Sequence, residues 1–343
     1  MTVQPDAGRL AAFVRERVEP FDALALRRVE GGQSNPTWIV DAGTRRYVLR
    51  SKPAGVLLPS AHAIEREFRV MQSLAGSAVP VPRVRALCED PGVLGSAFYL
   101  MDFVEGRILT DQTLPGMAPA ERAAHYAELA RVLAALHAVD HRSAGLADFG
   151  REGRYVERQI ERWTRQYRAS ETAPVPAMER LIDWLAGHVP AQTATCLVHG
   201  DYRLDNVVFH ATQPRIVAVL DWELSTLGDP LVDLACHCMG WHITLGTHHT
   251  LAGVDLGPLG IPDEAAHIAS YCRAAGRGEG IAHWPFYLAF NLFRLAAIQQ
   301  GVAQRALQGN ATNSRAQAVA ERVAATAAAG WAMAQRAAPA LPP

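Results

Sequence analysis

Lysine is almost missing from this chain of 343 residues, because Lys52 is the only one although lysine and arginine together number 33. These cations face 34 acidic residues, which leaves a formal net charge of −1 at pH 7. A chain without excess positive charge lacks the usual signature of a nucleic-acid-binding protein or a polybasic membrane anchor. Long apolar runs are also missing, since no stretch approaches the roughly 18 residues of a membrane-spanning helix. We therefore expect neither nucleic acid nor a membrane among the partners.

Cysteine is scarce as well, with five residues at no repeating spacing. An odd number does not complete a disulfide framework, and such cysteines are typical of reduced thiols. The first residues, Met1–Asp6, have neither a basic start nor an apolar run, so we expect no signal peptide. These features together predict a cytoplasmic protein. No feature of the sequence indicates an oligomeric state.

The first third of the chain has the pattern of strands joined by short turns. Apolar and β-branched runs are separated by turns that contain glycine and aspartate, which predicts an antiparallel meander. The predicted strands cover Leu26–Val29, Trp38–Val40, Tyr47–Leu49 and Ala97–Met101. Between the last two strands, apolar residues at helical spacing over Ala61–Leu74 predict a helix.

The remainder of the chain is mostly helical in pattern. Helices are predicted over Pro119–His137 and Tyr155–Tyr167, where the apolar residues form one stripe. The short apolar runs Cys196–Val198 and Ile216–Leu220 predict strands between helices.

The change of pattern near residue 106 predicts two lobes. We expect a strand-rich lobe over residues 1–106, which ends in a hinge, and a larger, mainly helical lobe over residues 107–337. Residues 338–343 are predicted to be a disordered tail. The predicted fold class is α+β.

The densest group of polar side chains lies beside the two short strands of the second lobe. Asn206 follows Asp201 by five positions, which is the spacing of the kinase catalytic loop, where the aspartate accepts a hydroxyl proton and the asparagine holds magnesium. Asp221 ends the run Ile216–Leu220, which would place its carboxylate near Asn206. Magnesium prefers such oxygen ligands together with substrate phosphates. An ordinary turn also uses aspartate and asparagine, but it does not require this order of strands and acids. We predict Asp201 as the catalytic base and Asn206 and Asp221 as metal ligands.

Two segments that contain these residues, His199–Phe209 and Leu220–Ala235, resemble the aminoglycoside phosphotransferase family, a branch of the protein-kinase-like fold. The run Asp221–Pro230 is similar to the kinase-like domain that is fused to acyl-CoA dehydrogenases. The resemblance extends over residues 31–235. It implies a two-lobe protein-kinase-like fold. It also implies an enzyme that uses ATP and magnesium to phosphorylate a hydroxyl of a small molecule.

The first lobe supplies candidates for binding the nucleotide phosphates. Gly32, Ser34 and Asn35 lie in a glycine turn between two predicted strands. The backbone amides of such a turn are suited to phosphate groups. An ordinary tight turn has the same composition. The prediction that this segment binds phosphates therefore rests on its place before the meander.

A cation and a hinge complete the predicted nucleotide site. Arg50 and Lys52 lie on the same face of the third strand, so either can reach the phosphates. Kinases carry a lysine on this strand, paired with a helix glutamate, and Arg50 stands at that place. Glu67 lies on the apolar flank of its helix, where a carboxylate needs a partner, and we expect one of these cations to pair with it. The backbone from Asp102 to Val104 is predicted to bind adenine.

Two other functions are compatible with parts of the sequence. A nucleotide-binding pseudokinase that acts as a regulatory module is compatible with an arginine at the lysine position. A zinc site could use Cys236, His237, Cys238 and His242. However, consecutive helical residues point in different directions, so these residues are predicted to belong to the core and the pocket wall.

The composition of the C-terminal third bears on the substrate. From Met239 onward there are five acids and seven arginines. The acids are Asp255, Asp263, Glu264, Glu279 and Glu321, and the arginines are Arg273, Arg277, Arg294, Arg305, Arg315, Arg322 and Arg336. A polycationic aminoglycoside wants a carboxylate-lined pocket. The balance therefore favours a neutral or anionic substrate, and the resemblance implies a hydroxyacyl thioester as a candidate.

Overall fold

The computed structural model describes residues 4–29, 35–53, 63–243, 250–278, 280–305 and 313–337. Its backbone divides into two compact units. The first unit comprises residues 1–108, 142–146 and 205–225, and the second comprises the rest. Residues 205–225 therefore belong with the N-terminal unit. The two units are thus discontinuous in sequence, and one boundary position does not separate them. The predicted tail over residues 338–343 lies outside the described residues.

The first unit is built on a five-stranded antiparallel sheet in the order β1-β2-β3-β5-β4. Its strands are β1 (Leu24–Arg28), β2 (Thr37–Ala42), β3 (Arg45–Ser51), β4 (Val84–Cys88) and β5 (Phe98–Asp102). The four predicted strands correspond to β1, β2, β3 and β5, so the meander is confirmed. β4 was not predicted, because its short sequence is defined by pairing with β5 rather than by a strong apolar pattern.

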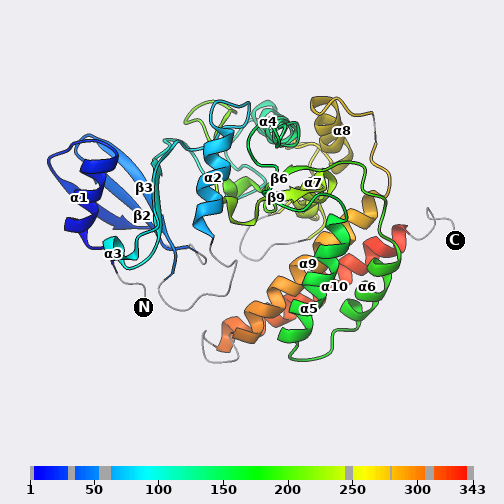
Figure 1. Cartoon of the computed structure of the whole chain (residues 1–343). Coiled ribbons are helices and arrows are strands. Elements are labelled where there is room, and N and C mark those ends of the chain that lie inside the picture. The colour runs from blue at the N-terminus through cyan, green and yellow to red at the C-terminus, as the bar shows by residue number, and fades with distance from the viewer. Residues whose placement is uncertain are drawn as a thin grey trace. The chain divides into compact units, whose positions relative to one another are not determined.

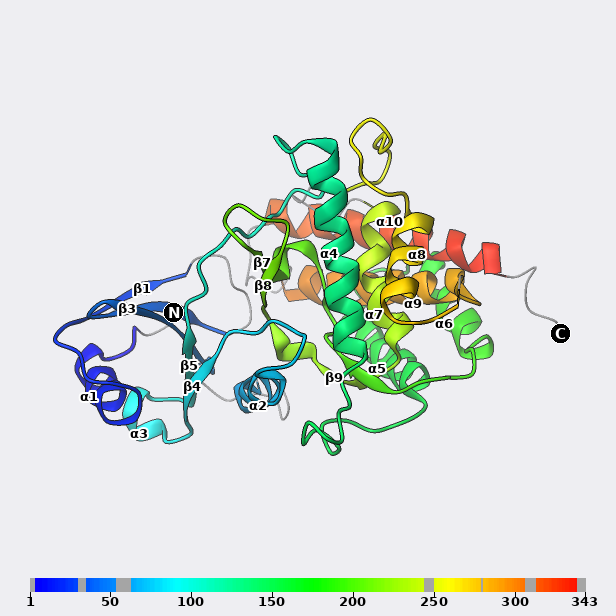
Figure 2. The ribbon, with the colours of Figure 1, turned by 90° about the horizontal axis from the view of Figure 1, so that it is seen from above.

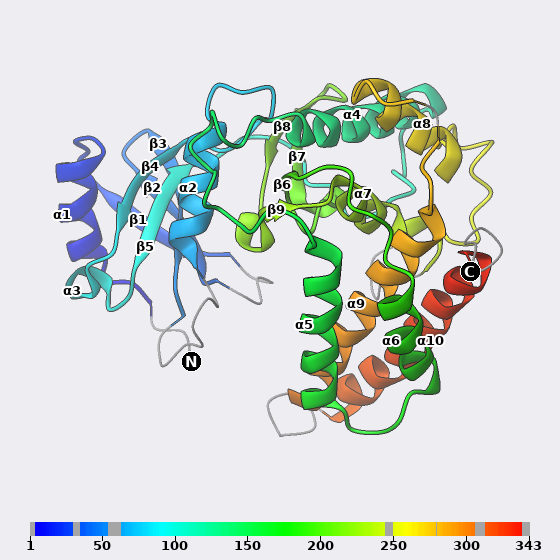
Figure 3. The same ribbon diagram turned by 45° about the vertical axis from the view of Figure 1, so that its right-hand side comes forward.

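The two faces of this sheet pack against different helices, as Figure 3 shows. Helix α1 (Ala7–Arg17) contributes Leu10 and Val14 to a core with Trp38, Val40 and Leu49. Side chains alternate across a strand, so the residues between these face the other side, where α2 (Ile64–Leu74) lies. A short helix, α3 (Pro91–Leu94), packs beside α1.

A hairpin from the middle of the chain completes the first unit. It consists of η1 (Leu204–Asn206), β7 (Val207–Phe209), β8 (Ile216–Val219) and η2 (Trp222–Leu224). The amide of Arg107 donates to the carbonyl of Phe209 at 2.7 Å, and the amide of Val219 donates to the carbonyl of Pro80 at 2.8 Å. Backbone hydrogen bonds therefore fasten the hairpin to the segments that flank β4 and β5.

The second unit is mainly helical. Its elements are α4 (Pro119–His137), α5 (Tyr155–Ser170), α6 (Pro176–Gly187), β6 (Cys196–Val198), β9 (Thr226–Gly228), α7 (Pro230–Cys238), η3 (Met239–Trp241), α8 (Glu264–Ala274), α9 (Trp284–Arg305) and α10 (Asn313–Ala337). Helices α5, α6, α9 and α10 pack alongside one another (Figure 1), and α4 packs against α8 (Figure 2). β6 pairs with β9. The predicted helix Pro119–His137 is confirmed to the residue, and the next one extends to Ser170.

The α+β fold class, with a small strand-rich lobe and a larger helical lobe, is therefore confirmed. None of the helices in the described parts of the chain is long and apolar enough to cross a membrane.

Candidate active site

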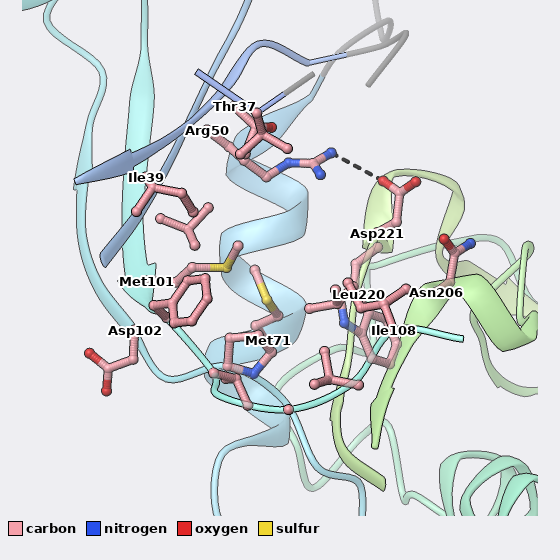
Figure 4. A pocket seen from close by; sticks show the side chains of 18 of the residues that line it. Thr37, Ile39, Arg50, Met71, Met101, Asp102, Ile108, Asn206, Leu220 and Asp221 are labelled. Carbon is pink, nitrogen blue, oxygen red and sulfur yellow. Dashed lines mark hydrogen bonds and ion pairs between the residues drawn. The ribbon is translucent and has the colours of Figure 1, made fainter. Parts of the chain in front are cut away.

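Asn206 and Asp221 are brought together by the hairpin of the first unit. Val207 pairs with Val219 across β7 and β8, and the amide of Leu220 donates to the carbonyl of Asn206 at 2.8 Å. The residues just outside the two strands therefore meet at one end of the hairpin, where Figure 4 shows both side chains. Asp221 has a φ of +64°. This left-handed conformation costs a non-glycine residue about 1 kcal/mol, and its neighbours must compensate for that cost.

Arg50 lies at the centre of a group of carboxylates in the same unit. Its Nε is 3.0 Å from Oε2 of Glu67, and its Nη2 donates to Oδ1 of Asp221 at 3.1 Å, the contact drawn in Figure 4. Glu223 is 4.0 Å from the same nitrogen. Arg50 thereby connects helix α2 to the end of the hairpin that carries Asp221.

Glu67 is the most enclosed acid of this group, with 1% of its surface exposed. The side-chain amide of Asn35 donates to it at 2.7 Å, and the hydroxyl of Tyr99 donates to it at 2.9 Å. Burial raises the pKa of Glu67, while the Arg50 charge and the Tyr99 hydroxyl act in the opposite direction. The charge of this carboxylate thus depends on Arg50 and on its hydrogen-bond donors.

Lys52 occupies a different place from Arg50. It follows the last residue of β3 and pairs with Glu65 on the outer part of α2. Burial lowers the pKa of Arg50, but Glu67 and the other acidic groups outweigh burial, so the pKa is raised and the guanidinium stays charged. The structure therefore joins the predicted helix glutamate to Arg50 and not to Lys52.

A cavity of about 430 Å³ opens beside Arg50, and all of its lining residues belong to the first unit. Its wall is apolar over most of its extent, and polar groups gather where Arg50, Asn206 and Asp221 line it. The apolar lining consists of Val29, Ile39, Val48, Met71, Pro82, Met101, Phe103, Val104, Ile108, Val208, Leu220 and Trp222. Figure 4 shows the same division, with Met101 and Ile108 away from the Arg50–Asp221 pair. Such a cavity suits a ligand with a flat apolar part and an anionic part.

The predicted hinge residues line the apolar part of this cavity. Both carboxylate oxygens of Asp102 accept hydrogen bonds from Arg85, at 2.6 and 2.8 Å, so this side chain is held by the sheet. Within the described part of the chain, the backbone amide of Val104 donates to no protein group. That amide is therefore available to a ligand. The backbone of Gly106 packs directly against the hairpin, since a Cβ at this position would lie 2.3 Å from the carbonyl oxygen of Phe209.

The glycine turn is only partly described. Gly32 and Ser34 lie outside the described residues. Asn35 is buried, and its side chain binds Glu67. The role of this turn in holding phosphates stays a prediction.

The segment that carries Asp201 belongs to the second unit. The amides of His199 and Gly200 donate to the two carboxylate oxygens of Asp233, at 2.7 and 2.8 Å. Asp201 forms an ion pair with Arg203, whose Nε is 3.1 Å from its Oδ1. The loop is thus fastened through its backbone, and the carboxylate of Asp201 remains partly exposed.

A model of the phosphotransferase enzyme family matches residues 25–255 of the chain. The chain belongs to this family. The match covers both the cavity of the first unit and the Asp201 segment of the second, so the family resemblance predicted from the sequence is confirmed.

Several known proteins are similar to this phosphotransferase. Mouse acyl-CoA dehydrogenase family member 10 is 48% identical over 86% of the chain, and the Arabidopsis thaliana probable acyl-CoA dehydrogenase IBR3 is 43% identical over 90%. The chain spans 28% and 40% of these two proteins, respectively. It therefore corresponds to less than half of either relative.

Two solved structures are similar to this chain in fold. A crystal structure from Ralstonia eutropha JMP134, provisionally named an aminoglycoside phosphotransferase, is 49% identical and covers 97% of this chain and 99% of its own, with a TM-score of 0.88. Aminoglycoside phosphotransferase APH(4)-Ia, in a ternary complex with AMP-PNP and hygromycin B, shares the fold at 20% identity, with a TM-score of 0.61 over 96% of this chain and 98% of its own.

The contacts of Tyr99 with Glu67 and of Arg85 with Asp102 belong to the site but were not predicted from the sequence. Tyr99 lies on the same face of β5 as Met101, and a buried phenol needs a hydrogen-bond partner. The alternation of β5 was the signal that could have pointed to Tyr99. Arg85 lies in β4, the strand that the sequence did not reveal, so its contact with Asp102 was also missed.

The cysteine and histidine cluster of α7 forms part of the core. Cys236, His237 and Cys238 are buried. His242 is bound to Glu264, with its Nε2 2.8 Å from Oε1. Over the described residues, no three His, Cys, Asp or Glu side chains converge in a way that could hold a metal. The core interpretation of this cluster is therefore supported.

Proposed function

We propose that this phosphotransferase transfers the γ-phosphoryl group of ATP to a hydroxyl of a small molecule, with magnesium as cofactor. The observation that carries the proposal is the cavity of the first unit, where an apolar wall continues into the polar group of Arg50, Asn206 and Asp221. Adenine fits the apolar part, and the phosphates fit beside Arg50.

The hinge supports adenine as the base. A purine can accept a hydrogen bond from the unengaged amide of Val104 while its flat face lies against Ile39 and Leu220. The crystallisation of APH(4)-Ia with AMP-PNP supports ATP as the nucleotide for the shared fold. Lys52, paired with Glu65, is the less suited of the two predicted phosphate-binding cations.

The residues of the site fit a magnesium ion. Asn206 offers an amide oxygen and Asp221 a carboxylate, and both line the cavity. Glu67, Asp221 and Glu223 surround one guanidinium. Burial raises the pKa of Glu67 to about 7, but Asp221 and Glu223 alone outnumber the one cation, and this excess of negative charge suits a divalent ion. Magnesium is usually bound by one or two carboxylates and completed by phosphates and water. When bound, it would neutralise charge on the phosphates, and Asn206 and Asp221 would hold it.

Asp201 is the proposed base. It would accept the proton of the acceptor hydroxyl as the oxygen–phosphorus bond forms and the bond between the γ-phosphorus and the ADP oxygen breaks. The backbone contacts of His199 and Gly200 with Asp233 support a fixed position for this carboxylate.

We propose a hydroxyacyl thioester as the acceptor. The chain matches part of proteins that are named acyl-CoA dehydrogenase family members. These names support an acyl thioester as the acceptor. The excess of arginines over acids after Met239 also favours an anionic acceptor over a polycationic aminoglycoside. The five buried free cysteines support a reducing, cytoplasmic location.

The test is ATP consumption with magnesium against a panel of hydroxyacyl-CoA thioesters, with kanamycin as the matched aminoglycoside. We expect turnover with a hydroxyacyl-CoA, loss of at least 100-fold of that turnover on Asp201→Ala, and unchanged ATP affinity in the same variant. Wild-type activity in Asp201→Ala would exclude it as the base. Phosphorylation of kanamycin without that of any thioester would exclude the proposed acceptor. Binding of ATP with no turnover on the whole panel would favour a pseudokinase.

A further inference from the structure

Arg294 is a buried cation next to the segment that carries Asp201. It lies in the middle of α9, with 8% of its surface exposed. Its Nη2 donates to the carbonyl of Gly200 at 2.6 Å. The guanidinium also lies over the ring of Trp163, with its Cζ 5.7 Å from the ring centroid.

The partner of this cation is unusual for a buried charge. Among the described residues, no carboxylate lies within ion-pair distance of Arg294, and its one hydrogen bond is the bond to Gly200. A buried charge costs free energy unless hydrogen bonds compensate for it. A leucine or methionine at this position would fill the same space without that cost. The contact with the Gly200 carbonyl, together with the charges of Asp201 and Asp233 beyond ion-pair distance, favours an arginine here.

The peptide group between Gly200 and Asp201 is held at both of its polar atoms. Gly200 has a φ of +84°, in the region that glycine enters freely. Arg294 binds its carbonyl, and the following amide, that of Asp201, donates to Nδ1 of His199 at 3.2 Å. Asp233 accepts hydrogen bonds from the two amides that precede this peptide group and not from the peptide group itself. Without Arg294, the carbonyl of a residue with wide conformational freedom would lose its side-chain partner.

We propose that Arg294 is a positioning residue that fixes the orientation of Asp201 through the carbonyl of Gly200. The catalytic part of this inference rests on the proposed role of Asp201 as base. Arg294 acts on the base and not on the nucleotide, since the nucleotide cavity is lined by residues of the first unit alone. Its removal should therefore lower kcat and leave the KM for ATP unchanged. A displacement of about 1 Å at a reacting group can cost on the order of 100-fold in rate.

The experiment compares three variants on the same helix. Arg294→Met removes the hydrogen bond and keeps the apolar stem, and Arg294→Lys restores a donor. Leu292→Ala is the control for lost stability, because Leu292 is fully buried and its Cβ faces Gly330 of α10. Each variant is measured for its Tm, for kcat and KM with ATP, magnesium and a hydroxyacyl-CoA, and for amide hydrogen exchange of residues 199–201.

We expect Arg294→Met to raise amide exchange of residues 199–201 by about 10-fold and to lower kcat by about 10- to 100-fold at an unchanged KM for ATP. Arg294→Lys should recover part of both effects. Leu292→Ala should lower the Tm and leave exchange of residues 199–201 and kcat within about threefold of wild type. The inference is overturned if Arg294→Met leaves exchange unchanged, or if Leu292→Ala reproduces its effect on kcat. Hydrogen exchange needs no acceptor, so it tests Arg294 even if the thioester proves to be the wrong substrate.

Discussion

Replacing Asp233 by asparagine probes the contact that fastens the Asp201 segment. The side chain of Asp233 is fully buried, and each of its two oxygens accepts one backbone hydrogen bond, from His199 and from Gly200. Nε2 of His137 is 3.3 Å from Oδ2. Asparagine has the same shape, but one of its two terminal atoms is an NH₂ group. That group would face a backbone N–H, donor against donor.

The magnitude follows from these contacts. A hydrogen bond to a charged group contributes about 1.5–3 kcal/mol, and a buried donor left without a partner costs about 1–3 kcal/mol. We therefore expect Asp233→Asn to lower the free energy of unfolding by about 3–5 kcal/mol. Asp183→Asn, on the exposed side of α6, is the control and should change it by less than about 0.5 kcal/mol.

The pH dependence of this loss has a defined sign. Burial raises the pKa of Asp233, but His137, His199 and the backbone amide outweigh burial, so the pKa is lowered in the folded protein. A carboxyl with a lowered folded pKa stabilises the protein above its unfolded pKa, and this contribution is lost as pH falls through the folded value. Urea unfolding should show a constant difference between wild type and Asp233→Asn from pH 5 to 8, and a smaller one below about pH 4. A loss under 1 kcal/mol at pH 7, or a difference that grows on acidification, would refute the reasoning.

Three further predictions concern other parts of the molecule. Burial lowers the pKa of His237 to about 4, so the unfolded chain binds its proton first and stability should fall by about 3 kcal/mol between pH 6.5 and 4. His237→Phe should remove this part of the pH dependence in urea unfolding, and an unchanged pH profile would contradict the burial argument. Gly106→Ala should lower the Tm and weaken ATP binding by calorimetry, since its Cβ would lie 2.3 Å from the carbonyl oxygen of Phe209 and overpacking costs about 1–3 kcal/mol; full ATP affinity would show that the segment adapts. Asp221→Ala should abolish the increase in ATP affinity that magnesium produces, measured by thermal shift with and without the ion, and a retained increase would exclude Asp221 as a metal ligand.

The sequence was sufficient where local pattern determines structure. The helix Pro119–His137 begins at a first-turn proline and carries one apolar stripe, so its bounds were predicted to the residue. The approach of Asn206 to Asp221 was also predictable, because two short apolar runs joined by a turn form a hairpin whose ends must meet. The family could be identified from the same segment.

The choice between Arg50 and Lys52 was decided only by tertiary structure. The sequence pattern places the two residues on one face of one predicted strand, and their spacing leaves them equivalent. In the folded unit, Arg50 lies inside β3 against Glu67, while Lys52 lies beyond the end of the strand and meets Glu65. Which cation is enclosed depends on where α2 crosses the sheet, and strand alternation carries no information on that crossing.

The residues of the Asp201 segment and its contacts could be predicted from the sequence to different degrees. Asp201 could be selected from its spacing to Asn206, because that spacing is local. Arg294, which binds the carbonyl just before Asp201, comes 94 positions after Gly200 and sits in a helix that is largely apolar. Nothing in a helical pattern identifies the backbone group that a buried side chain will reach. That contact exists only because helix packing closes a long segment of chain onto the loop.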